Sequence, residues 1–109
     1  MKTYVDQLQA LLKQIPGSVE EADLPQLEAA ATGFQHVLKL VQHHESGSGI
    51  NVLYFYQHLQ DIESALYEAK YGNNQKQRNA AFKKAKKELA AGIEDLVRFI
   101  NRHTSSSTH

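Results

Sequence analysis

Cations gather near the start of the last helical segment of the sequence. Residues 76–87 hold six lysine and arginine side chains and no acid. At about 100° per residue, Lys76, Lys83 and Lys87 share one stripe of a helix, opposite its apolar face. Lys84 lies beside that stripe. These four lysines are a candidate anion-binding surface for nucleic-acid phosphates or another polyanion. No stacking aromatic shares the face, so we favour a solvated lysine surface over a nucleic-acid site.

The same segment offers two ion pairs between successive helical turns. Lys84 precedes Glu88 by four residues, and Glu94 precedes Arg98 by four. Oppositely charged side chains meet at this spacing on a helix. The three lysines of the stripe have no such partner within the helix.

Histidines raise the question of a metal site. His36 and His43 are seven residues apart, roughly 10 Å along a helix, which is too far to share an ion. Neither H-E-x-x-H nor E-x-x-H occurs, so the sequence predicts no metal. The alternative is a contact between His44 and His58 across two helices. We expect His58 to be half-buried, with Asp61 one turn away as its partner.

Tyrosines ring the segment 51–71. If this segment is a helix, Leu53 and Tyr71 lie on the same side of it, far from its apolar face. If they are exposed, Leu53, Tyr54, Tyr67 and Tyr71 form a protein-binding surface, because tyrosine supplies contact area at low entropic cost. The same exposure predicts a homodimer through this helix. The simpler interpretation, which we favour, is packing at the core edge with the hydroxyl groups in water.

Groups for covalent or acid–base catalysis are sparse. The chain has no cysteine, which removes thiolate nucleophiles, thiolate metal sites and disulfides together. No serine lies in a G-x-S-x-G turn, and the segment 45–49 lacks the Gly-Lys-Ser/Thr ending of a phosphate loop. We therefore expect no enzymatic activity and no cofactor.

Length and charge bound the class of protein. The chain has 109 residues, enough for one domain, and its twelve basic residues balance twelve acidic ones. Residues 1–54 hold three lysines and six acids, whereas residues 55–109 hold nine basic and six acidic residues. No signal-peptide pattern opens the sequence, and no apolar run approaches the roughly 18–20 residues that a membrane span needs. We expect a soluble cytoplasmic protein.

The apolar pattern of residues 51–71 organises the rest of the chain. Its members recur at alternating spacings of three and four residues, as on one face of an amphipathic helix. They are Val52, Phe55, Leu59, Ile62, Leu66 and Ala69. Since neighbouring side chains widen this face to about half the circumference, more than one neighbour has to cover it.

Three further amphipathic segments, separated by turn residues, complete the pattern. The expected helices span about 3–15, 24–44, 51–71 and 75–102, and 103–109 is expected to be a disordered tail. The sequence therefore predicts an all-α fold in one domain, 1–102: an antiparallel up-down-up-down four-helix bundle. Because the first helix is short, a three-helix bundle with a loosely docked first helix is the alternative. Gly33 predicts close approach of a neighbour, a kink or a break.

Turn residues mark the expected helix ends. Asp23 with Gln26, and Asn74 with Gln77, have the spacing of a capping box at a helix start. Gly72 is placed to stop the third helix.

The size, the helix pattern, the basic last helix and the polar tail are similar to bacteriocin immunity proteins of Gram-positive bacteria. The resemblance is one of architecture without a shared motif, and it implies a bacterial protein with a membrane-associated partner. The residues themselves favour a small non-enzymatic bundle that acts by protein–protein interaction. Polyanion binding through the lysines is the alternative.

Overall fold

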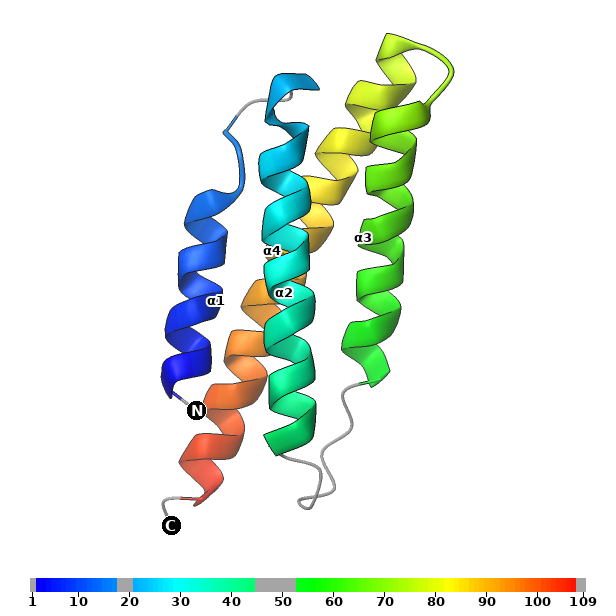
Figure 1. Ribbon diagram of the computed structural model, residues 1–109. Helices are drawn as coiled ribbons and strands as arrows, with labels where there is room; N and C mark the ends of the chain where they lie inside the picture. The colour runs from blue at the N-terminus through cyan, green and yellow to red at the C-terminus, as the bar shows by residue number, and fades with distance from the viewer. Residues whose placement is uncertain (1, 18–20, 45–52, 108–109) are drawn as a thin grey trace.

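The computed structural model of the chain describes residues 2–17, 21–44 and 53–107. Within these ranges it contains four α-helices and no strand. The elements are α1 (Lys2–Gln14), the 3-10 turn η1 (Glu21–Asp23), α2 (Leu24–His44), α3 (Leu53–Tyr71) and α4 (Gln75–Ser107). Successive helices run in opposite directions, so that α1 begins and α4 ends at the same end of the molecule (Figure 1). The predicted up-down-up-down four-helix bundle is confirmed.

The bundle is flattened, with principal extents of 53 × 23 × 16 Å. The most extensive packing is between α3 and α4, and α1 packs against both α2 and α4. Because α2 also reaches α4 across the diagonal, α1 and α3 lie at opposite edges of the body (Figure 1). The contact between α2 and α3 is much smaller than that between α3 and α4.

All four helices contribute to one apolar core. The helix α3 buries the predicted seam from Phe55 to Ala69, with Leu66 half-buried and Val52 outside the described residues. From α1, Leu8 is fully buried and Leu11 nearly so. A docked α1 of this kind is an integral part of the bundle, so the three-helix alternative is wrong.

Gly33 lies inside an unbroken α2, so a break, one of the three expected alternatives, does not occur there. A Cβ at this position would lie 2.5 Å from Cδ2 of Leu11 in α1. The glycine therefore permits close approach of a neighbour, one of the expected alternatives, and the neighbour is a side chain. The start of α2 is also tied to α1, because the Gln26 amide donates a hydrogen bond of 2.6 Å to the carbonyl of Gln14. The side-chain amide of Gln26 thus links the start of α2 to the end of α1.

The junction of α3 and α4 follows the expected turn chemistry. The Asn74 side chain accepts a hydrogen bond of 2.7 Å from the backbone N–H of Gln77, as an N-cap does. The side-chain N–H of Gln77 in turn donates to the carboxylate of Glu68 at 2.7 Å, which ties the start of α4 to α3. Gly72 follows the last residue of α3, where a Cβ would lie 2.7 Å from the carbonyl oxygen of Glu68. Close approach of backbone explains glycine at this stop.

The last helix is longer than the sequence predicts. The expected end at Arg102 lies inside α4, whose backbone is helical to Ser107. No proline or glycine occurs between residues 93 and 107, so no residue type there interrupts the helical backbone. The expected start of α3 near Asn51 falls outside the described residues.

Candidate functional site

A groove between α2 and α3 is flanked by two exposed tyrosines. The side chains of Tyr67 and Tyr71 are 68% and 61% exposed. Their ring centroids are 4.8 Å apart, and the Lys70 ammonium lies 5.6 Å from the centroid of the Tyr71 ring. Successive turns of α3 present these side chains together, since residues four apart share one face of a helix. The simpler expectation of core-edge packing is therefore wrong for these two tyrosines.

The groove has an apolar floor and a polar rim. Its volume is about 310 Å³, and Ala31, Leu59 and Leu66 lie among its lining residues. The charged side chains on it are Glu28 of α2 with Glu63 and Lys70 of α3. The groove forms where α2 and α3 have only a small contact. Apolar floor with polar rim is the composition of protein-binding surfaces.

The expected four-residue partner surface is divided in the structure. Tyr54 is 61% exposed, but it lines a different hollow, between α3 and α4, together with Phe55 and Phe99. Tyr54 and Tyr67 are separated by thirteen residues, roughly 20 Å along a helix, and by more than 100° around it. The side chain of Leu53 lies outside the described ones. Tyr67 and Tyr71 therefore lie together at one groove, and Tyr54 lies apart from them.

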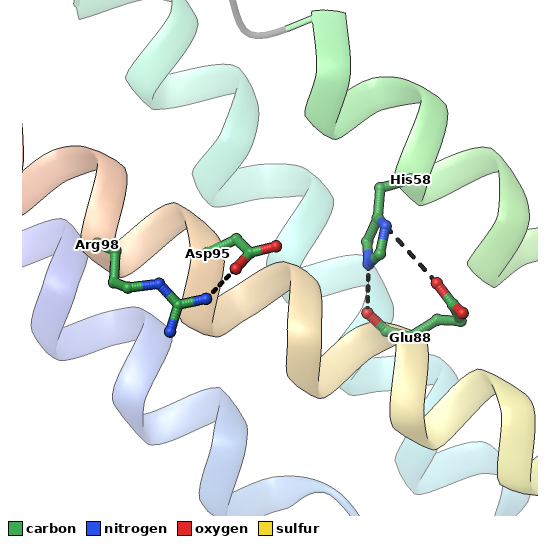
Figure 2. Close-up of polar contacts among 4 residues, drawn as sticks. All are labelled: His58, Glu88, Asp95 and Arg98. Carbon is green, nitrogen blue, oxygen red and sulfur yellow. Dashed lines mark hydrogen bonds and ion pairs between the residues drawn. The ribbon is translucent and has the colours of Figure 1, made fainter.

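A polar contact that the sequence does not reveal joins α3 to α4. His58 reaches across to Glu88, as Figure 2 shows. Its Nε2 lies 2.6 Å from the backbone carbonyl oxygen of Glu88, and its Nδ1 lies 3.6 Å from the Glu88 carboxylate. A carbonyl oxygen only accepts, so Nε2 carries a proton and donates. Protonation of Nδ1 converts the second contact into an ion pair. The expected partner, Asp61, is on the same helix and is exposed.

Space for the His58 ring comes from a glycine on α4. A Cβ at Gly92 would lie 2.6 Å from Cδ2 of His58 and 3.3 Å from Cζ of the buried Phe34. The ring of Tyr54 lies roughly parallel to the imidazole, at a centroid distance of 6.4 Å. In the sequence, the only sign of this contact is that Glu88 and Gly92 are one helical turn apart on the same side of α4. The sequence does not show which side of α4 faces His58, so it does not predict the contact.

The lysine surface consists of exposed side chains. Lys76, Lys83, Lys84 and Lys87 all point to solvent, and none of them has an ion-pair partner among the residues that the structure describes. The expected pair of Lys84 with Glu88 is not formed, because the Glu88 carboxylate is directed to His58.

Arg98 likewise does not pair with Glu94 as expected. Its guanidinium contacts Asp95, one turn earlier on α4 (Figure 2).

Within residues 2–17, 21–44 and 53–107, no three histidine, aspartate or glutamate side chains gather as metal ligands would. The expected alternative of His44 with His58 cannot be placed, since the His44 side chain lies outside the described ones. In the same ranges, no helix has both the length and the apolar character that crossing a bilayer requires.

The chain matches no protein-family model, no curated protein and no solved structure. None of these comparisons supports the expected resemblance to bacteriocin immunity proteins.

Proposed function

We propose that this protein is a non-enzymatic binding module, which acts by protein–protein interaction through the outer face of α3 and the adjoining groove. The observation that carries the proposal is the pair Tyr67 and Tyr71, exposed by about two thirds and in contact with each other at the rim of the groove. Large apolar side chains left in water at one place are typical of an interface.

The test is a pull-down from a lysate of the source organism with three tagged proteins. They are the parent, the double variant Tyr67→Ser/Tyr71→Ser and the control Tyr54→Ser, which changes an equally exposed tyrosine elsewhere on α3. All three changes lie on the surface, so each should alter the free energy of unfolding by no more than about 0.5 kcal/mol. Circular dichroism checks this.

A protein captured by the parent and the control, and lost with the double variant, supports the proposal. A captured set that is the same for all three proteins refutes it.

A second candidate function is polyanion binding through Lys76, Lys83, Lys84 and Lys87. The observation in its favour is that Glu88, the acid expected to neutralise Lys84, is directed to His58. The four cations therefore face solvent together, without a partner in the described part of the chain. Such a surface attracts phosphate or sulfate polymers without reading a sequence.

Gel retardation of single-stranded DNA and of heparin at low salt tests this candidate. Parent protein should bind with an affinity that falls as salt rises, and Lys83→Ala/Lys87→Ala should reduce the salt dependence by about two released counterions. Absence of retardation at low salt removes the candidate.

A further inference from the structure

The outer face of α3 carries charges that complement the same face of a second copy of the chain. Six exposed side chains make up this face: Gln60, Glu63, Ser64, Tyr67, Lys70 and Tyr71. At about 100° per residue they fall within roughly 60° of Tyr67 on either side. We define these six residues as the α3 outer face. Figure 1 shows that α3 lies at an edge of the bundle, so a neighbour can approach it.

Glu63 and Lys70 lie on one flank of this face, seven residues and two helical turns apart. When two identical helices pair antiparallel about a two-fold axis, residue i of one meets residue j of the other, and j meets i. In such a pair each flank also meets the same flank of the other helix. An axis between positions 66 and 67 therefore brings Glu63 of each copy to Lys70 of the other, which forms two equivalent ion pairs.

The shape of the face agrees with the same register. Gln60, Glu63, Ser64 and Tyr67 line an open hollow on α3. Four residues at these spacings form the hole into which a side chain of a facing helix inserts. With the axis near Tyr67, Tyr71 of one copy lies opposite this hollow of the other copy. Tyr67 itself lies next to the axis, where its ring meets that of its symmetry mate.

We propose that the partner of the α3 outer face is a second copy of the chain, a step that rests on the protein-binding function proposed above. The two protomers pair antiparallel through α3, with Glu63 of each facing Lys70 of the other and the tyrosines at the centre. Whole-molecule charge does not oppose this association, because the formal net charge is zero at pH 7.

Charge reversal tests the register. Purified full-length protein is examined by sedimentation equilibrium from roughly 1 µM to 1 mM, the range of weak to moderate affinities. The parent should change from monomer to dimer within this range. Glu63→Lys alone and Lys70→Glu alone each convert two attractive pairs into two repulsive ones, so each should weaken the dimer about tenfold.

An equimolar mixture of the two single variants is the decisive sample. Each mixed dimer restores both attractive pairs, so its affinity should return to about that of the parent. The matched control is Asp61→Lys, which makes the same charge change at an exposed position of α3 outside this face. It should leave the dimer unchanged.

A cross-link gives a second readout that does not depend on charge. The chain has no cysteine, so a variant with Tyr67→Cys contains a single thiol beside the proposed axis. Under mild oxidation it should form a disulfide with its symmetry mate faster than Lys83→Cys, a control thiol on the exposed surface of α4.

Two results overturn the inference: a parent that stays monomeric over the whole concentration range, or a dimer that the mixture of variants does not restore. Neither result refutes the protein-binding function. That function fails only if the lysate pull-down is insensitive to the loss of Tyr67 and Tyr71.

Discussion

Replacement of Gly92 by alanine should destabilise the protein, although alanine is the better helix former. In an open helix interior the change stabilises by about 1 kcal/mol. Here the new methyl group would lie 2.6 Å from Cδ2 of His58 and 3.1 Å from its Nε2. The ring cannot rotate away freely, because Nε2 donates to the carbonyl of Glu88 at 2.6 Å.

The expected magnitude follows from three contributions. Overpacking in a filled interior costs about 1–3 kcal/mol. Displacement of the His58 ring loses its hydrogen bond to Glu88, which costs about 1 kcal/mol. The gain in helix propensity offsets about 1 kcal/mol. We therefore expect Gly92→Ala to lower the free energy of unfolding by about 1–3 kcal/mol.

A double-mutant cycle isolates the cause. In a His58→Ala background the obstructing ring is absent, so the same Gly92→Ala change should become neutral or stabilising, by at most about 1 kcal/mol. The gain is limited by Phe34, whose Cζ would lie 3.3 Å from the new methyl group. Urea unfolding of the four proteins, followed by circular dichroism, gives the required free energies.

The reasoning is refuted if Gly92→Ala stabilises the parent. It is also refuted if the change has the same cost with and without the His58 ring, because the steric conflict would then lie elsewhere.

Three further predictions concern the core, a helix end and the effect of pH. Ile62→Ala removes a fully buried side chain of α3 and should lower the free energy of unfolding by about 2–5 kcal/mol. Lys83→Ala, on the surface of α4, should change it by no more than about 0.5 kcal/mol. Equal effects of the two changes in urea unfolding would show that the buried and exposed helix faces are misassigned. Arg78→Ala should cost about 1 kcal/mol in the same assay, because its guanidinium donates a hydrogen bond of 2.8 Å to the carbonyl of Gly72, just after the end of α3. An unchanged free energy of unfolding would mean that water replaces this hydrogen bond. Burial raises the pKa of the Tyr56 phenol above its ordinary value of 10.0, so the stability linked to this group is fully present below pH 10.0 and is lost as the pH rises through the raised folded value. Tyr56→Phe should remove that part of the loss of stability at alkaline pH. An unchanged dependence of stability on pH would contradict this prediction.

The sequence by itself determined the helices and their buried faces. The alternating spacing of three and four residues in α3 places Phe55, Leu59 and Ile62 on one side of a helix, and all three are buried. Such periodicity is local, since it depends only on the rise and turn of one helix. The cap at Asn74 and the stop at Gly72 are local in the same sense, and both ends lie where the sequence predicts them. Short connections between four such helices then favour antiparallel neighbours.

Only the tertiary structure decided which partner each polar side chain takes. Glu88 is one turn from Lys84 in the sequence, yet it contacts His58 of another helix. Gln26 has capping-box spacing, yet it donates to the carbonyl at the end of α1. The choice of partner depends on how neighbouring helices are rotated and shifted along their axes relative to each other. The sizes of the side chains packed between the helices determine this rotation and shift. Gly92 shows the physical reason, because the absence of one methyl group lets a ring from α3 reach the backbone of α4.

The division of the exposed tyrosines has the same origin. Tyr54, Tyr67 and Tyr71 are equivalent in type, and the pattern of α3 alone leaves open whether neighbouring helices cover them. The flattened arrangement, in which α2 contacts α3 only sparsely, leaves Tyr67 and Tyr71 beside a groove and Tyr54 on the α4 side. Which tyrosines are exposed together thus depends on which parts of α3 the neighbouring helices leave uncovered, and that is a property of the packed bundle.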